Sequence, residues 1–546
     1  MAVEPAVAAV TEPTDDPAAP ARVARSASLI AALTVASRAA GFGRTLVFAW
    51  AVGATALGGV YQSANTVPNI IFEIVAGGAL ASLVVPLLAD AVARGDRAAV
   101  GATTSALLTW VLIVLVPVAV GVALLAGPIV ALLDRDAAPA TLDVGTGMLR
   151  VFAPQLPLYG VGIVLTGVLQ AHRRFAWPVL APLLSSVTVV VAYGVFAAVA
   201  GRKPEIGQVG TGELLVLSVG TTLGVVALSL CLLVPLRRLG LRLRPTYRFE
   251  AETSRAVRRL AIAGAVTVAA QQLSLGLAIA LANGGPDGSV VLYALAQTIY
   301  LLPWAVLALP IATSAFPALA ESAALRDRAG YAATLAPAAR GLVLFSCLGA
   351  GALAALAGPL ARLLAGTTAG PQTVGPVAAG VAGFAPGLVG YALFALLSRA
   401  LYARGDTRLA AGATVLGWAV VAVVSIGLAE ALPRPERVAA LAWANSAGML
   451  VLGGVLLVVV TRRAGGAALA GFARAGLTGV VAAGAAAAAG IATLHLTPDS
   501  ATALGQGMLG AAVVGTVFLA VAYVLDRPDV APALAAVARR VRRARS

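Results

Sequence analysis

Hydrophobic residues along this chain are grouped into long runs that short polar segments separate. A run such as 106-ALLTWVLIVLVPVAVGVALLAG-127 is apolar almost throughout and shows no alternation of polar and apolar positions. About twenty helical residues cross the roughly 30 Å hydrocarbon core of a bilayer, whereas the strands of a membrane barrel would alternate. The pattern therefore predicts an all-α polytopic membrane protein with about 14 transmembrane helices. The predicted spans are residues 27–52, 57–89, 102–127, 145–169, 177–200, 211–236, 258–283, 288–318, 338–365, 374–402, 408–430, 437–461, 471–495 and 503–525.

Basic residues fall in the segments between these runs, and they favour one side of the membrane. If the first span begins in the cytoplasm, about 31 basic residues lie on the inner side against about 7 on the outer side, as the positive-inside rule requires. We therefore expect both termini to be cytoplasmic. The basic segment 237–259 and the basic tail 539–545 are expected to contact anionic membrane lipids.

An internal repeat divides the chain into two similar halves. The segment 34-TVASRAAGFGR-44 resembles 267-TVAAQQLSLGL-277, 86-PLLAD-90 resembles 317-PALAE-321, and the basic turns at Arg173 and Arg404 correspond. A near-constant offset predicts two parallel six-helix repeats, or lobes, related by an axis along the membrane normal. We expect a disordered cytoplasmic N-terminus at 1–26, an N-lobe at 27–236, a basic cytoplasmic linker at 237–257, a C-lobe at 258–461, a C-terminal helix pair at 462–525 and a basic cytoplasmic tail at 526–546.

Composition narrows the class of function. The chain is 60% hydrophobic and only 11% charged, whereas soluble domains carry about 25% charged residues. The net charge of +15 does not indicate nucleic-acid binding, because the basic residues lie in loops between spans. Two cysteines within apolar runs and two scattered histidines predict neither a disulfide framework nor a metal site. We also find no phosphate-binding loop or catalytic motif, so the sequence predicts a transporter without cofactors and not an enzyme.

Two arginines lie inside the first predicted span, where a charge costs roughly 2.5–3.5 kcal/mol on insertion scales. Arg38 and Arg44 are six positions apart, so they point about 120° apart on a helix and both could border one wide cavity. There they would bind an anionic headgroup such as pyrophosphate through paired hydrogen bonds. Glu73 in the second span is the expected counter-ion. The alternative is that the arginines extend to the cytoplasmic surface or form a buried ion pair with Glu73.

Polar amides and prolines lie in spans of both lobes. The amides could line the cavity and bind sugar hydroxyls, or they could join neighbouring helices through hydrogen bonds worth about 0.6 kcal/mol each. Pro68 and Pro303 could be bending points for alternating access, or kinks that serve packing alone. The candidate amides are Gln62, Asn65, Asn69, Gln271, Gln272 and Gln297.

The motifs of the first two spans resemble a known family. The stretches 37-SRAAGFGR-44 and 53-GATALGGVYQSANTVPNIIFEIVAGGALASLVVPLLA-89 are similar to the first two helices of the MurJ/MviN lipid II flippases, members of the superfamily of multidrug and oligosaccharidyl-lipid exporters. Segments 168–184 and 400–408 resemble later turns of that family. The resemblance implies a flippase of the bacterial cytoplasmic membrane that moves a lipid-linked peptidoglycan precursor outward, with its first-helix arginines at Arg38 and Arg44.

The chain departs from that family's charge pattern at several positions. Gly59 replaces an aspartate before the V-P-N motif, and Phe72 and Glu73 replace a pair of arginines after it. Gly77 stands in place of a glutamate, and Thr298 in place of an arginine of the eighth helix. The cavity implied by the resemblance therefore has fewer cations than is usual in the family.

These observations leave three hypotheses about function. The first is a flippase that moves lipid II or a related polyprenyl-pyrophosphate-linked glycan from the inner to the outer leaflet by alternating access, driven by an ion gradient or the membrane potential. The second is an antiporter of drugs or metabolites in the same superfamily, coupled to a cation (H⁺ or Na⁺) through Glu73. The third is a non-transporting scaffold that recruits enzymes of cell-envelope synthesis.

Overall fold

The computed structural model describes residues 19–246, 251–365, 370–497 and 502–531, and every regular element within these ranges is a helix. Eleven helices of the described chain are long and apolar enough to cross a membrane, or up to 12 if the bent pair Pro371–Phe384 and Gly387–Ala403 is one span. The all-α polytopic fold is confirmed. The count of about fourteen spans stays a prediction, because the first two predicted spans are not among these eleven.

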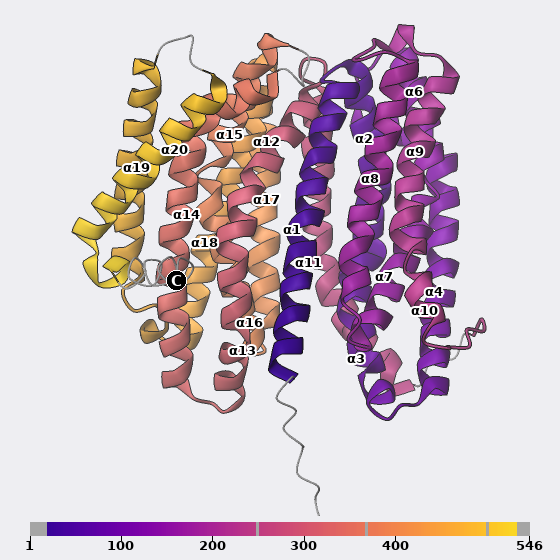
Figure 1. Ribbon diagram of the computed structural model, residues 1–546, viewed down its shortest axis with the longest axis horizontal. Coiled ribbons are helices and arrows are strands. Elements are labelled where there is room, and N and C mark those ends of the chain that lie inside the picture. Colours follow the sequence, from indigo (N-terminus) through magenta and orange to yellow (C-terminus); the bar gives the residue numbers. More distant parts are fainter. Residues whose placement is uncertain (1–18, 247–250, 366–369, 498–501, 532–546) are drawn as a thin grey trace, which may run out of the picture.

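The N-lobe, on the right in Figure 1, contains the first half of the described chain. Its membrane helices are bundled around a core that includes the fully buried rings of Tyr61, Phe152 and Phe196. Its elements are α1 (Ala19–Ala51), α2 (Ala56–Phe72), η1 (Glu73–Gly77), α3 (Gly78–Ala93), α4 (Arg97–Leu124), α5 (Ala126–Leu133), α6 (Pro139–Phe152), α7 (Gln155–Ala171), α8 (Ala176–Val199), η2 (Ile206–Gln208), α9 (Thr211–Leu230) and α10 (Leu233–Arg237).

The C-lobe lies on the left in Figure 1, and α11 runs between it and the N-lobe. Its elements are α11 (Ala251–Asn283), α12 (Ser289–Pro303), η3 (Trp304–Ala308), α13 (Leu309–Ala324), α14 (Arg328–Ala365), η4 (Pro371–Thr373), α15 (Val374–Phe384), α16 (Gly387–Ala403), α17 (Thr407–Ala431), η5 (Arg434–Glu436), α18 (Arg437–Ala464) and η6 (Gly466–Leu469).

Two further helices, α19 (Phe472–Leu496) and α20 (Ala503–Leu525), pack together against the outer side of α14. Two ion pairs hold one end of this helix pair. Arg340 Nε of α14 lies 2.8 Å from Asp529 Oδ2, and Arg474 Nη2 of α19 lies 3.1 Å from Asp526 Oδ1. These bonds link α14 and α19 to the segment that follows α20.

The structure repeats local details at the same offset as the sequence. Each lobe contains one five-residue π-helical segment, η1 and η3, and their first residues, Glu73 and Trp304, are 231 positions apart. At the same offset, Asp96 Oδ1 accepts a hydrogen bond of 2.9 Å from the Ala99 amide, and Asp327 Oδ1 accepts one of 2.9 Å from the Gly330 amide. Matching helix caps and π-helical segments support the duplication that the sequence predicts.

The predicted domain limits fall close to element boundaries, and some lie outside the described residues. Residues 1–18 of the predicted N-terminal segment are not described, and α1 begins at Ala19. The predicted linker 237–257 contains the undescribed residues 247–250, and the tail is described only as far as residue 531. The domain limits therefore stay a prediction.

The turns after α3, α7, α13 and α16 share one end of the bundle, the lower end in Figure 1. We name this end the basic end, because arginines cluster in its turns. We name the other end of the bundle the opposite end. The arginines of these turns are Arg94, Arg97, Arg173, Arg174, Arg326, Arg328, Arg404 and Arg408.

The two lobes meet at the opposite end. Gly288, which precedes α12, has φ of +78°, and a Cβ built on it would lie 2.2 Å from the backbone oxygen of Ala54 in the N-lobe. Asn283 Nδ2, at the end of α11, donates to Ser63 Oγ at 3.1 Å and to the Leu133 carbonyl at 2.8 Å. The backbones of the two lobes therefore touch at a point where only glycine fits.

Replacing Gly288 with alanine tests this contact. A left-handed backbone costs a non-glycine residue about 1–2 kcal/mol, and at Gly288 the new methyl group would also push Ala54 away. Gly95 is the matched control, because its φ is +69° and a Cβ there would meet no atom within 4 Å. We expect Gly288→Ala to lower the melting temperature of the purified protein clearly more than Gly95→Ala. Equal decreases would contradict the close approach of the lobes.

Candidate functional site

A polar chamber lies between the two lobes. It consists of two adjoining cavities of about 510 and 250 Å³, a size typical of ligand-binding sites. The N-lobe lines it with residues of α1, α2, α7, α8 and α9, and the C-lobe with residues of α11 and α12. The polar residues that border both cavities are Arg44, Gln62, Asn65, Thr221 and Gln297.

Arg44 is the one charged side chain among the described residues that line the chamber. No carboxylate of the described chain lies within ion-pair distance of it. The remaining polar lining consists of hydroxyl and amide groups, such as Ser185, Asn69 and Thr66. A guanidinium group can bind an anion through two parallel hydrogen bonds. The neutral polar groups around Arg44 could then form hydrogen bonds with the rest of the bound molecule.

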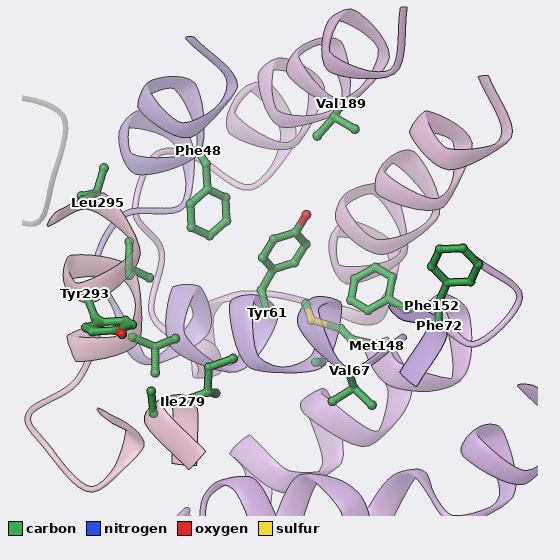
Figure 2. Close-up of a cluster of buried hydrophobic side chains, with 14 of the residues drawn as sticks. Phe48, Tyr61, Val67, Phe72, Met148, Phe152, Val189, Ile279, Tyr293 and Leu295 are labelled. Carbon is green, nitrogen blue, oxygen red and sulfur yellow. The ribbon is translucent and has the colours of Figure 1, made fainter. Parts of the chain in front are cut away.

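A buried hydrogen-bond cluster fixes the chamber wall beside Arg44. Tyr61 Oη of α2 lies 2.8 Å from Tyr193 Oη of α8 and 2.7 Å from Thr221 Oγ1 of α9. Figure 2 shows the Tyr61 ring between Phe48 and Phe152, with ring centroids 5.0 and 5.7 Å away. Because Tyr193 and Thr221 also line the chamber, this cluster holds three helices of the N-lobe in place around the charged group.

A second cavity, of about 570 Å³, lies beside α11 near the opposite end. Asp134, Arg135, Asp136 and Arg437 line it, so its charges balance. Burial raises the pKa of Asp134 above its ordinary value, and the nearby carboxylates of Asp136 and Asp287 raise it further. Unlike the chamber, this cavity has no excess positive charge that would attract an anion.

Comparison with known proteins identifies the family. The family model described as "Lipid II flippase MurJ" matches residues 48–509 of the chain. The chain belongs to the MurJ family. A curated MurJ family member from Burkholderia cenocepacia, named "Lipid II flippase MurJ", is 26% identical over 393 residues, which are 70% of this chain and 74% of that protein. One from Vibrio cholerae, named "Probable lipid II flippase MurJ", is 24% identical over 74% of this chain and 76% of its own length.

Solved structures agree on the fold of this MurJ family member. A structure described as "Lipid II flippase MurJ, inward closed conformation" superposes with a TM-score of 0.72 at 16% identity, covering 91% of this chain and 99% of that one. An inward-facing multidrug transporter of the MATE family reaches a TM-score of 0.65 at 13% identity, covering 81% and 98%. At such low identities the similarity concerns the fold alone.

The structure separates the two arginines that the family resemblance pairs. Both arginines are exposed, but only Arg44 lines the chamber; Arg38 does not, although its neighbour Ser37 does. Glu73 is partly buried at the start of η1, outside the chamber lining, and forms no ion pair with either arginine among the described residues. The predicted counter-ion role of Glu73 therefore gains no support from the geometry.

The predicted amide side chains line three different cavities. Asn65 and Asn69 line the chamber. Gln271 lines a smaller cavity inside the C-lobe, whereas Gln272 faces the cavity beside α11. Gln271 and Gln272 diverge because neighbouring residues of a helix point about 100° apart.

The two candidate hinge prolines lie close to the π-helical segments. Pro68 is five residues before η1, and Pro303 directly precedes η3. They are not equivalent positions of the repeat, because the offset of 231 that relates η1 and η3 does not relate them. π-Helical segments are frequent at functional sites, and the position of both prolines near such segments is compatible with hinges. The hinge role stays a prediction.

The sequence analysis did not find Tyr61, Tyr193 and Thr221. Each lies in an apolar run, and their partners are 132 and 160 positions away along the chain. Tyrosines within transmembrane runs are a signal that a hydrogen-bond partner is needed, but one sequence does not show which partner.

Substituting Tyr61 with phenylalanine tests the cluster. The change removes a hydroxyl that bonds to both Tyr193 and Thr221, so we expect a loss of about 1–3 kcal/mol in stability. Tyr293→Phe is the control, because Tyr293 also lines the chamber but has no hydrogen bond through its hydroxyl among the described residues. Thermal unfolding should show a lower melting temperature for Tyr61→Phe alone, and an unchanged value would refute a structural role for the cluster.

Proposed function

We propose that this protein flips lipid II, or a closely related polyprenyl-pyrophosphate-linked cell-wall precursor, from the inner to the outer leaflet of the bacterial cytoplasmic membrane. The observation that supports this most is the chamber between the lobes, whose one described charge is the guanidinium group of Arg44. The choice of lipid II as the transported molecule rests on the description of the matching family, "Lipid II flippase MurJ". The protein acts in this proposal as a transporter, without enzymatic chemistry.

Arg44 has the chemistry to hold the pyrophosphate. Guanidinium binds phosphate oxygens through two parallel hydrogen bonds, and hydrogen bonds to charged groups are worth about 1.5–3 kcal/mol. The chamber's neutral hydroxyls and amides suit the sugars of the headgroup. The apolar polyprenyl chain stays among the lipid tails of the membrane, so it is not transferred into water during transport.

The contacts between the lobes are of the kind that can break and re-form. The interlobe pair Arg434–Asp136 has an N···O distance of 3.4 Å, and its side chains are 71% and 69% exposed. Exposed ion pairs of this type contribute about 0–1 kcal/mol. In this structure α1 packs mainly against α8 of its own lobe and meets the C-lobe chiefly at α12. Opening the opposite end by rocking the lobes would break this exposed pair and the hydrogen bonds of Asn283 to Ser63 and Leu133.

The orientation follows from the basic end. With the arginines of that end in the cytoplasm, both termini are cytoplasmic and the chamber loads from the inner leaflet. The basic end would also contact anionic membrane lipids and enzymes that deliver the precursor. The membrane potential or an ion gradient would drive transport, since moving one charge across it is worth about 2.3 kcal/mol per 100 mV. Among the described residues that line the chamber, there is no carboxylate that could bind a coupling cation such as H⁺ or Na⁺.

A leaflet-accessibility assay tests the function in cells. In a strain depleted of this protein, we expect lipid-linked precursor to remain on the cytoplasmic leaflet and to become exposed outside when the wild-type gene is restored. Normal outward exposure in the depleted strain would refute the proposed function.

The same assay tests the role of Arg44 against a matched control on its own helix. Arg44→Ala removes a charged hydrogen-bonding group worth about 1.5–3 kcal/mol, so we expect flipping to fall about ten- to a hundredfold. Arg38→Ala should retain flipping close to wild type, because Arg38 does not line the chamber. Equal effects of the two substitutions would contradict the assignment of Arg44 as the pyrophosphate-binding residue.

A further inference from the structure

A smaller cavity of about 180 Å³ lies within the C-lobe, behind the chamber. We call it the side cavity. It is lined by residues of α11, α12, α16, α17 and α18, and it shares Leu275, Tyr293 and Gln297 with the chamber lining. It has the room of about six water molecules at the ~30 Å³ that each occupies in the liquid. A group of the size of a single sugar ring could therefore fit in it, next to the chamber.

The lining of the side cavity is aromatic and neutral. No charged side chain of the described chain borders it. Seven of its thirteen lining residues carry an aromatic ring or a carboxamide. They are Tyr293, Tyr300, Tyr391, Trp418, Gln271, Gln297 and Asn445.

Two of these residues present buried polar atoms that have no partner. Tyr300 is 3% exposed and Asn445 is 5% exposed. The hydroxyl of Tyr300 and the Oδ1 atom of Asn445 form no hydrogen bond within the described chain. Buried polar groups are almost always hydrogen-bonded, and each exception needs an explanation. A hydroxyl that can donate and a carbonyl oxygen that accepts suit a ligand group that does both, such as a sugar hydroxyl or an amide.

The walls around these two groups are held in place. The Tyr300 ring stacks on Phe384 with centroids 4.9 Å apart. Trp304 Nε1 donates to the Tyr391 carbonyl at 3.3 Å, and Ser274 Oγ donates to the Trp418 carbonyl at 2.9 Å. A ligand entering the side cavity would therefore meet side chains that are already ordered, which lowers the entropic cost of binding.

We propose that the side cavity is a subsite for an uncharged sugar or amide-bearing group of the cargo's headgroup, bound while Arg44 holds the pyrophosphate. This inference rests on the proposed function. An apolar ligand would leave the Tyr300 hydroxyl and Asn445 Oδ1 unsatisfied. A metal cation would find no carboxylate there, although hard cations are usually held by carboxylate oxygens. The aromatic rings suit the apolar faces of a sugar ring.

The subsite predicts that the C-lobe distinguishes a headgroup with sugars from one without them. The two probes are lipid II and polyprenyl pyrophosphate, which carries the same charged group and no glycan. Binding of each is measured to the purified full-length protein in lipid nanodiscs. Wild-type protein should bind both lipids, and lipid II more tightly.

Two variants remove the unpartnered atoms: Tyr300→Phe, which nearly conserves the side-chain volume, and Asn445→Leu, which keeps the branching of the side chain but is larger. We expect each to weaken lipid II binding about tenfold and to leave polyprenyl pyrophosphate binding unchanged. Thr414→Val is the matched control, because Thr414 is buried on α17 and bonds only to the Ala410 carbonyl of its own helix. It should bind both lipids as the wild type does.

The outcomes separate the two proposals. If wild type binds both lipids but neither variant weakens lipid II binding selectively, the subsite is refuted and the flippase proposal stands. If the wild type binds neither lipid, the proposed function fails, and the subsite with it. Melting temperatures show whether each variant is folded. The Tyr300→Phe protein should be at least as stable as the wild type because it loses a hydroxyl without a partner, so it decides the question if Asn445→Leu does not fold.

Discussion

A charge inside a bilayer must have a polar environment, and Arg44 has one because it faces the chamber between the two lobes. Much of the arrangement around it follows from this requirement. The chamber is built where polar residues of α1, α2, α8 and α9 meet those of α12, while the apolar faces of other helices are left to the lipid. The duplicated lobes supply two walls, and neither lobe alone would enclose the guanidinium group.

Rigid walls and a weak seam have different physical origins in this protein. The wall beside Arg44 is fixed by the buried cluster of Tyr61, Tyr193 and Thr221, which joins three helices of one lobe. The seam between the lobes includes the exposed Arg434–Asp136 pair, the hydrogen bonds of Asn283 to Ser63 and Leu133, and a close backbone approach at Gly288. Lobes that are stiff inside and loosely joined can move as units, which is the mechanical basis of alternating access.

The sequence predicted the helices well, because hydrophobic runs and bilayer thickness fix their positions. The predicted span 211–236, for example, agrees with α9 and α10, and the repeat is found again in η1 and η3. The site was predicted only in part. The spacing of Arg38 and Arg44 gives the angle between them but not the direction of the chamber, so the sequence alone could not show that Arg44 faces it and Arg38 does not. Contacts between residues far apart in the chain, such as that of Tyr61 with Thr221, depend on which helices pack side by side, and a single sequence does not show this.

Chemical labelling of the chamber tests the account most directly. In a chain whose native cysteines Cys231 and Cys347 are replaced by alanine, a cysteine is introduced at Asn65, in the chamber, or at Val120, which is 53% exposed on the outer surface of α4. In lipid nanodiscs, where both faces of the membrane are open to solution, a membrane-impermeant maleimide should label Asn65→Cys, lipid II should protect it, and Val120→Cys should stay unlabelled within the bilayer. An Asn65→Cys protein that does not react, or that reacts equally with and without lipid II, would contradict a polar chamber that holds the cargo.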